Sequence, residues 1–166
     1  MCTAQRITTT RLDLLPLSVS HAEEMAVVLS DPALHTYIGG APDSPSALRS
    51  RYQRITAGSP DRGVSWLNWV IQLRGSGLVG TVQATVRDAV AEIAWVVGTP
   101  WQGRGIATEA ARGLVDWLLR QPVDAVIAHV HPENRASAGV AAAAGLAATD
   151  EQQDGEIRWR RTRQTR

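Results

Sequence analysis

The sequence predicts an α+β fold: a mixed, mostly antiparallel central sheet flanked by helices. Strands are indicated by alternating apolar residues, as at 66–73, and helices by apolar residues at helical spacing, as at 107–120. The expected order is β-α-α-β-β-β-α-β-α-β-β, in which hairpins outnumber crossovers. A length of 166 residues suits one domain, 1–166, with a core at about 8–162 and no visible linker or repeat.

In the N-terminal half, serine caps and Pro/Gly clusters set the element boundaries. We expect a strand at 12–17, ended by Pro16, and a helix through Leu29 that begins at Ser18 or Ser20 and stops at Asp31-Pro32. A short turn at 34–38, a loop at 39–42 and a helix from Ser44 or Ser46 through Ile55 follow.

The C-terminal half contains most of the sheet. We expect a hairpin of strands 66–73 and 78–87, a strand at 90–98, a helix at 107–120, a strand at 125–130, a helix at 135–144, and two short strands that turn at Gly155. Pro122 breaks the first of these helices, and Gly145 closes the second after a cap at Asn134. The segment from 90 to 130 can form one β-α-β crossover.

Composition narrows the class of protein. Hydrophobic residues make up 44% and charged residues 20%, as in soluble globular proteins. No apolar run approaches the roughly 20 residues of a membrane helix, and the first ten residues lack an apolar signal core. The single cysteine, Cys2, excludes an internal disulfide and a cysteine metal cluster. We therefore expect a cytoplasmic protein with no membrane partner and no metal site.

Charge gives no case for a nucleic-acid partner, because the net charge is only +1. One basic cluster remains, at Arg158, Arg160, Arg161, Arg163 and Arg166. It is either the solvated face of a terminal strand or a patch for an acidic substrate or RNA. Strand alternation places Arg158 and Arg160 on one face and Arg161 on the other.

The segment 102–107, Gln-Gly-Arg-Gly-Ile-Ala, lies directly between a strand-like and a helix-like run. Its two glycines permit a tight turn with uncovered N–H groups, and the helix start adds further unpaired N–H groups. Such a turn binds anions, most readily a phosphate. We therefore expect a phosphorylated ligand here.

Two common phosphate-binding motifs match the loop poorly. A Walker loop needs Lys and Ser/Thr after its second glycine, whereas Arg104 and Gly105 follow Gly103. A dinucleotide fingerprint needs a third glycine where Thr108 stands. An ordinary strand-to-helix turn is the remaining alternative from the residues alone.

Several segments in order resemble one family. The motif Gln102-x-x-Gly105-x-Ala107 resembles the acetyl-CoA pyrophosphate signature of the GNAT N-acetyltransferases. Residues 91–97 resemble the family's fourth strand, 131–137 its Pro-x-Asn-x-x-Ser segment, and 143–146 the end of the next helix. Residues 10–17 resemble the opening strand of the ribosomal-protein (RimJ/RimL-like) branch.

The resemblance implies acetyl-CoA as the cofactor and a set of residues that hold it. The backbone groups of Val96 and Val97, in the fourth strand, would pair with the pantetheine arm like an added strand. The loop would bind the pyrophosphate, and Asn134 would contact CoA, serve only as a helix N-cap, or do both. The expected cofactor residues are Trp95, Val96, Val97, Gln102, Gly103, Arg104, Gly105, Ile106, Ala107, Thr108, Asn134 and Ser137.

Two residues are candidates for catalysis. Glu92 lies in an otherwise apolar strand, where burial would raise its pKa toward that of a general base. The resemblance implies that it is the base, as in some members of the family, or a group that orients the amine directly or through water; alternatively, it is simply a paired or edge-exposed carboxylate. Ser137 matches a serine that the ribosomal-protein branch uses near the CoA sulfur, where a hydroxyl would stabilise the leaving thiolate. Alternatively, its hydroxyl only contacts the backbone of the helix. The chain departs from the family in having no tyrosine near this helix, since Tyr37 and Tyr52 come early.

The acceptor pocket is expected from Tyr37, Trp66 and Asn68 with the loop 39–46, although strand tryptophans more often belong to the core. Arginines outnumber acids at 34–62, which argues against polycationic aminoglycosides. We predict an acetyl-CoA-dependent N-acetyltransferase that acts on a small-molecule amine or a protein N-terminus by direct attack. The alternatives are a non-catalytic acyl-CoA sensor on the same fold and a dinucleotide-binding protein. Homodimers are common in this branch.

Overall fold

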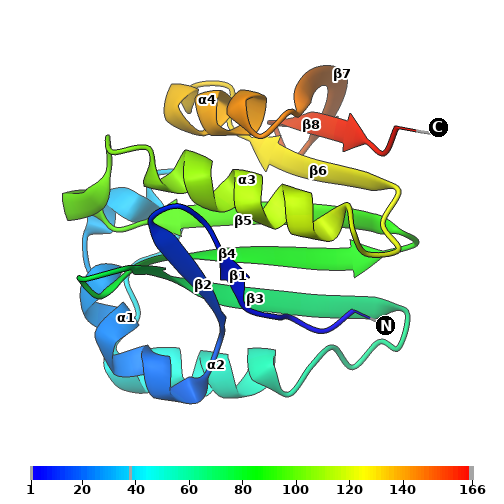
Figure 1. Ribbon diagram of the computed structural model, residues 1–166. Coiled ribbons are helices and arrows are strands. Elements are labelled where there is room, and N and C mark those ends of the chain that lie inside the picture. Colours follow the sequence, from blue (N-terminus) through cyan, green and yellow to red (C-terminus); the bar gives the residue numbers. More distant parts are fainter. Residues whose placement is uncertain (1, 38, 165–166) are drawn as a thin grey trace.

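The computed structural model describes residues 2–37 and 39–164 (Figure 1). Eight strands form one sheet in the order β1-β2-β3-β4-β5-β6-β8-β7. All neighbours pair antiparallel except β5 and β6, which are parallel, so the predicted mixed α+β fold is confirmed. The strands are β1 (Ile7–Thr8), β2 (Leu12–Pro16), β3 (Val64–Leu73), β4 (Leu78–Arg87), β5 (Val90–Val97), β6 (Ala125–Val130), β7 (Ala147–Gln153) and β8 (Glu156–Thr162).

Two of the helices begin at capping residues that the sequence predicts. Ser44 accepts a hydrogen bond from the Ala47 N–H at the start of α2, and Asn134 accepts one from the Ser137 N–H at the start of α4. The α-helices are α1 (Ala22–Val28), α2 (Pro45–Thr56), α3 (Ile106–Leu118) and α4 (Arg135–Ala143), with short 3-10 turns η1 (Val19–His21), η2 (Pro32–His35) and η3 (Thr99–Trp101).

Most expected elements occur within a few residues of their predicted bounds. Strands β4 and β6 have the predicted bounds, and β3 begins two residues earlier than the expected Trp66. The two-residue strand β1 was not predicted, because so short a segment carries no periodicity. Ile38, at the end of the expected turn, and Arg166, in the basic cluster, lie outside the described residues.

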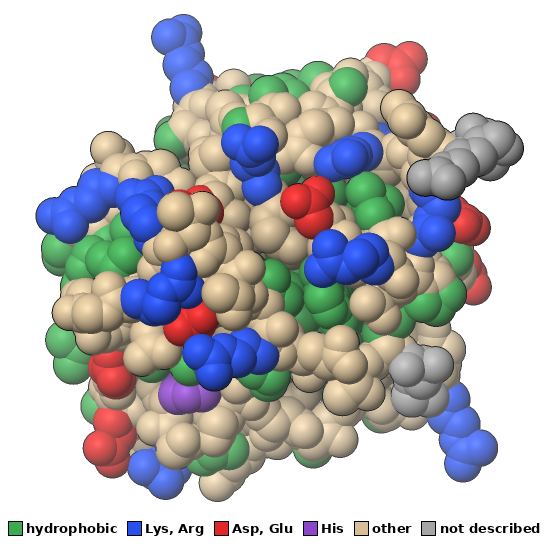
Figure 2. Space-filling view, in the orientation of Figure 1, with side chains coloured by type: hydrophobic (Ala, Val, Ile, Leu, Met, Phe, Trp, Pro, Cys, Tyr) green, Lys and Arg blue, Asp and Glu red, His purple; other side chains and the backbone are tan. Residues whose placement is uncertain are grey.

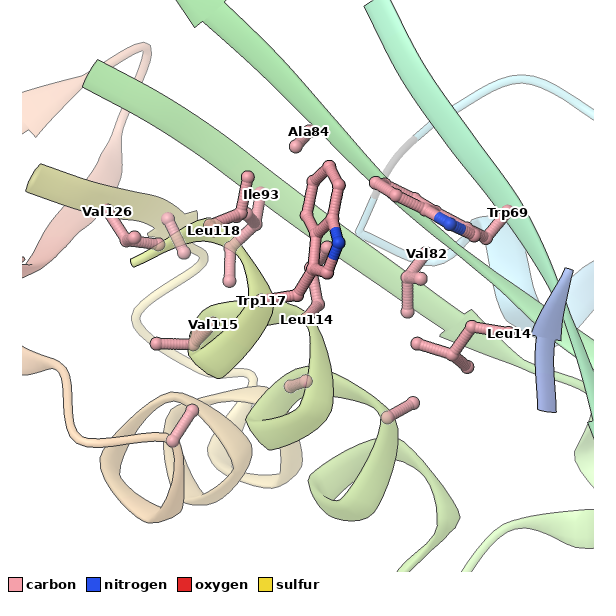
Figure 3. Packing of buried hydrophobic residues seen from close by; sticks show 14 of the residues in the cluster. Leu14, Trp69, Val82, Ala84, Ile93, Leu114, Val115, Trp117, Leu118 and Val126 are labelled. Atoms are coloured by element: carbon pink, nitrogen blue, oxygen red, sulfur yellow. The ribbon is translucent and has the colours of Figure 1, made fainter. Parts of the chain in front are cut away.

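Helices α3 and α4 cover one face of the sheet, and α1 and α2 cover the other (Figure 1). The larger core lies under α3, where the rings of Trp69 and Trp117 meet edge to face at 5.4 Å (Figure 3). Gln5 accepts hydrogen bonds from both indoles, through its carbonyl at 2.7 Å and its side chain at 3.4 Å. The N-terminal segment thus provides the hydrogen-bond acceptors for these two buried indole N–H groups.

The feature that positions the site is a gap between β5 and β6. These strands pair only at residues 90–92 of β5 and 125–127 of β6, and no register partner follows among the described residues. On its other side β5 stays paired with β4 along its whole length. The backbone edge of β5 beyond Glu92 is therefore left without a strand partner.

Gly80 in β4 lets the backbone of β5 approach at this point. A Cβ atom built on Gly80 would lie 2.2 Å from the Val96 carbonyl oxygen and 3.0 Å from the Val97 Cα. Both neighbours are backbone atoms, so the strand itself would have to move to admit a methyl group.

We expect Gly80→Ala to lower the free energy of unfolding by about 1–3 kcal/mol because of this clash. Urea denaturation measures it. The matched control is Gly139→Ala, in α4, where a Cβ meets nothing within 4 Å and helix propensity predicts a gain of about 1 kcal/mol. Equal stability of Gly80→Ala and the wild type would contradict the close approach.

Candidate active site

A cavity of about 590 Å³ lies at the gap between β5 and β6 and continues to the loop before α3 and the start of α4. Of the expected cofactor residues, all except Arg104 line it. The lining includes Ile93, Ala94, Trp95, Val96, Val97, Gln102, Gly103, Gly105, Ile106, Ala107, Thr108, His129, His131, Asn134, Ser137 and Glu156. Segments far apart in the sequence thus converge as expected.

The sheet register shows which backbone groups of β5 face the gap. The Gly98 N–H donates to the Val79 carbonyl of β4 at 2.8 Å, and hydrogen-bonding positions alternate along an antiparallel ladder. Val96 therefore points its N–H and C=O toward Thr81 of β4, while Trp95 and Val97 point theirs into the gap. The expectation for Val96 is thus corrected: it lines the cavity without offering its backbone there.

Gln102 fixes the end of β5 to the loop. Its side-chain Nε2 donates to the Val97 carbonyl at 3.0 Å. This bond occupies the last gap-facing carbonyl of the strand and holds the loop against it. The glutamine of the motif is therefore a positioning residue in this chain.

The loop before α3 presents a series of backbone donors. Gly103 and Gly105 both have φ +76°, a left-handed conformation that favours glycine. The first helical N–H with a backbone acceptor is that of Glu109, bonded to the Gly105 carbonyl. Among the described residues, the N–H groups of 103–108 have no hydrogen-bond partner, and α3 begins at Ile106. This arrangement suits an anion.

Arg11 and Glu109 anchor this loop from the far side. Arg11 donates through Nη1 to the Arg104 carbonyl at 2.9 Å and through Nε to Glu109 at 2.8 Å. Burial raises the pKa of Glu109, but hydrogen bonds from Thr9 and from the Arg11 backbone and side chain outweigh it and lower the pKa overall. Glu109 therefore stabilises the fold above its unfolded pKa and loses this effect as the pH falls. Arg104 contributes its backbone to the loop, and its side chain does not line the cavity.

At the opposite wall, Asn134 and Ser137 share one helix start. The Asn134 Oδ1 accepts the Ser137 N–H at 3.1 Å, so its N-cap role is confirmed, and its amide nitrogen has no hydrogen-bond partner in the described part of the chain. The Ser137 hydroxyl has no hydrogen-bond partner among the described residues. Both side chains line the cavity.

Glu92 belongs to a chain of polar side chains that runs across strands β5, β6 and β8. Its side chain is 46% exposed, so the expected burial is wrong. Its Oε1 pairs with Nδ1 of His129, whose Nε2 accepts from Arg158 at 3.1 Å. Because arginine only donates, the proton of the neutral imidazole lies on Nδ1 and faces Glu92. Sequence reasoning missed this link: His129 and Glu92 are 37 residues apart.

Glu92 itself lies just outside the cavity. Ala94, two residues along the same strand face, lines it, which places Glu92 about 7 Å farther along β5. The Oε2 atom of Glu92 has no hydrogen-bond partner within the described part of the chain. A carboxylate oxygen is thus held beside the cavity and left open.

A second cavity, of about 280 Å³, lies between the sheet and helices α1 and α2. It shares Leu34, Ala94, Trp95 and Val96 with the first, so the two cavities meet at the end of β5. Its lining also includes Leu17, Ala26, Leu29, Asp43, Leu48, Arg51, Tyr52, Ile55, Asn68, Thr81 and Gln83.

The expected acceptor residues separate in the structure. Asn68 lines the second cavity. Tyr37 instead lines the first, where its ring lies 5.0 Å from that of His131 and its hydroxyl donates to the Glu133 carbonyl at 3.4 Å. Trp66 is 39% exposed and lines neither cavity, so it is not part of the described site. A tyrosine thus does reach the neighbourhood of α4, from an early segment that sequence spacing did not connect with it.

Tyr52 lines the second cavity and carries a buried hydroxyl group. The residue is 4% exposed, and its hydroxyl has no hydrogen-bond partner in the described ranges. Burial raises the pKa of Tyr52 to about 12, against a lowering effect of Arg51 and with a smaller raising effect of Asp43. The hydroxyl is therefore a neutral donor at ordinary pH.

The described arginines of the C-terminal basic cluster line neither cavity. Arg158 and Arg160 both pair with Glu151, while Arg161 and Arg163 bond the carbonyls of Ala144 and Val123. On the face shown in Figure 2, arginines are scattered and acidic side chains lie between them.

None of the described helices is both long and apolar enough to cross a membrane.

Comparison with known proteins identifies the class. Residues 11–147 match the acetyltransferase (GNAT) domain family, so the chain belongs to this family. It is accordingly a GNAT-type N-acetyltransferase by family, and acetyl-CoA is the cosubstrate of such enzymes. Among curated protein sequences, none matches this chain.

Several solved structures share the fold. RimL, a ribosomal L7/L12 α-N-protein acetyltransferase in complex with coenzyme A, is 18% identical with a TM-score of 0.78, over 95% of this chain and 98% of that one. An acetyltransferase from Agrobacterium tumefaciens is 25% identical with a TM-score of 0.75, over 97% and 96%. AAC(6')-Ib in complex with paromomycin and acetyl-CoA is 19% identical with a TM-score of 0.76, over 92% and 94%.

Proposed function

We propose that this protein transfers the acetyl group of acetyl-CoA to a primary amine by direct attack of the amine on the thioester. The observation that carries the proposal is the meeting of two cavities at the end of β5. The first cavity takes the cofactor, and the second takes the acceptor. The sequence holds one cysteine, Cys2, and it lines neither cavity, which favours direct attack over an acyl-cysteine intermediate.

The cofactor is held by backbone groups. Its pyrophosphate accepts hydrogen bonds from the loop N–H groups of 103–108, where the dipole of α3 adds favourable charge. Its pantetheine arm lies in the gap as an added strand, paired with the backbone of Trp95 and Val97. The free amide nitrogen of Asn134 contacts the same arm.

Three side chains serve the reaction. Glu92 removes the amine proton through its open oxygen, and the distance along β5 suits a relay through one water. His129 is a positioning residue, because Arg158 occupies the ring nitrogen that a base would need. Ser137 donates a hydrogen bond from its hydroxyl to the departing thiolate. Tyr37 lines the same cavity and is a second candidate donor.

Two alternatives are separated by direct measurement. Thiol release from acetyl-CoA in the presence of amines distinguishes an enzyme from a non-catalytic acyl-CoA sensor, which binds without turnover. Calorimetry with CoA and NAD tests a dinucleotide-binding protein. Binding of NAD without binding of CoA would overturn the proposal.

We expect Gly103→Ala to weaken CoA binding by about tenfold, because a residue with a side chain disfavours φ +76° and tilts the donor N–H groups. Isothermal titration with CoA measures the affinity. Gly75→Ala is the matched control: φ is +80° in the turn between β3 and β4, and a Cβ there also meets nothing within 4 Å. Both variants should lose similar stability, and only Gly103→Ala should lose affinity. Equal affinities would exclude the loop as the pyrophosphate site.

We expect Glu92→Gln to lower kcat by about 10²–10⁴-fold while CoA affinity stays unchanged, since a general base acts on the amine and not on the cofactor. The rate should also lose its rise with pH. Glu23→Gln, an exposed carboxylate on α1, is the control and should retain full activity. If Glu92→Gln keeps the wild-type kcat, the base lies elsewhere.

A further inference from the structure

We propose that Arg158 is a positioning residue for the transfer reaction: it keeps the His129 imidazole neutral, so that the ring orients Glu92 without pairing with it as a cation. The inference rests on the proposed function, in which Glu92 is the base, and adds a residue that acts on this base from two strands away in the sheet. It is carried by the fork between β5 and β6, by the hydrogen bonds of the ring, and by the partners that hold Arg158.

The bond between Glu92 and His129 crosses the point where β5 and β6 separate. Glu92 and Ile127 form the last register pair of the two strands, and His129 lies two residues farther along β6. Alternate residues of a strand share a face, so all three side chains lie on one side of the sheet. Among the described residues, Nδ1 of His129 is the one hydrogen-bond partner of the Glu92 side chain. The position of the carboxylate therefore depends on what this nitrogen presents to it.

Arg158 decides how many protons the ring carries. Its Nε–H donates to Nε2 of His129 at 3.1 Å, and a nitrogen that accepts through its lone pair cannot also bind a proton. The neutral ring then offers Glu92 a single Nδ1–H. The His129 side chain is 8% exposed, so water has little access to replace either partner. His131 and Glu156 line the same cavity, and neither bonds the ring in the described part of the chain.

The charge of the ring matters because Glu92 has to accept a proton. A neutral N–H holds the carboxylate with one hydrogen bond, whereas an imidazolium would form an ion pair that favours its ionised form. A carboxylate stabilised by such a pair is a weaker general base. If Arg158 were absent, Nε2 would be free to bind a proton and the ring would face Glu92 as a cation.

The edge strand β7 holds Arg158 in place. The Nη1 atom of Arg158 donates to Glu151 at 3.2 Å, and its Nη2 atom donates to Gln153 at 3.4 Å. All three nitrogens of the guanidinium therefore have acceptors, two in β7 and one in β6. Because the guanidinium is planar, these bonds fix the direction of its Nε–H. The support of Glu92 thus extends across four strands to the edge of the sheet.

Nitrogen NMR of the imidazole at pH 7 tests the inference in the free protein. We expect wild-type His129 to be neutral with its proton on Nδ1, and Arg158→Leu to carry a proton on both ring nitrogens. His129→Asn identifies the signal among the four histidines. Arg160→Leu is the matched control, because Arg160 pairs with the same Glu151 from the same strand. It does not bond His129 in the structure, and its variant should retain the wild-type signal.

The same variants separate an effect on chemistry from an effect on binding. Relative to the wild type, Arg158→Leu should lower kcat about tenfold at pH 7 and recover most of it at pH 9, where the ring gives up its second proton. CoA affinity should stay within about twofold of the wild type, which also shows that the variant folds. Arg160→Leu should keep the wild-type kcat at both pH values. A loss of kcat that is equal at pH 7 and pH 9 would indicate a purely structural role and overturn the inference.

The spectra decide the remaining cases. A wild-type ring with its proton on Nε2, or a neutral ring in Arg158→Leu, would overturn the inference. If Arg158→Leu does not fold, the wild-type spectrum decides: a neutral ring with its proton on Nδ1 upholds the inference, and any other state overturns it. If no amine is acetylated although acetyl-CoA binds, the proposed function fails, and the spectra still show whether Arg158 keeps His129 neutral.

Discussion

The separation of β5 from β6 after residues 90–92 is the constraint on which the rest of the site depends. An unpaired strand edge inside a sheet leaves backbone N–H and C=O groups without partners, which is unfavourable unless a ligand supplies them. In this chain the gap-facing groups belong to Trp95 and Val97. One of them, the Val97 carbonyl, already accepts a hydrogen bond from the Gln102 side chain. The fold therefore keeps a place open for one extended ligand.

The strands on either side of the gap are held in place by their outer neighbours. On one side β4 holds β5 along its whole length, and Gly80 permits the close approach. Beyond β6, β8 pairs with all six of its residues, so β6 is also held from its outer edge. At the far end, Arg11 and Glu109 fix the glycine loop against α3. Each strand is thus held from outside the gap, and the cavity needs no mobile element to form.

The parts of the site that depend on local sequence could be predicted. The glycine loop, the Asn134 cap and the strand before the loop each follow from a few consecutive residues. The link from Glu92 through His129 to Arg158 could not, because it joins three strands whose register no local pattern specifies. The same holds for Tyr37 beside His131, and for Tyr52, which reads as an ordinary core residue of an amphipathic helix.

Amide hydrogen exchange of β5 shows whether CoA fills the gap as an added strand. We expect saturating CoA to slow exchange of the Trp95 and Val97 amides at least about tenfold, because the ligand pairs with them as a strand would. The Val96 amide, directed toward Thr81 in β4, should change little. CoA binding that leaves Trp95 and Val97 as exchangeable as in the free protein would contradict the account.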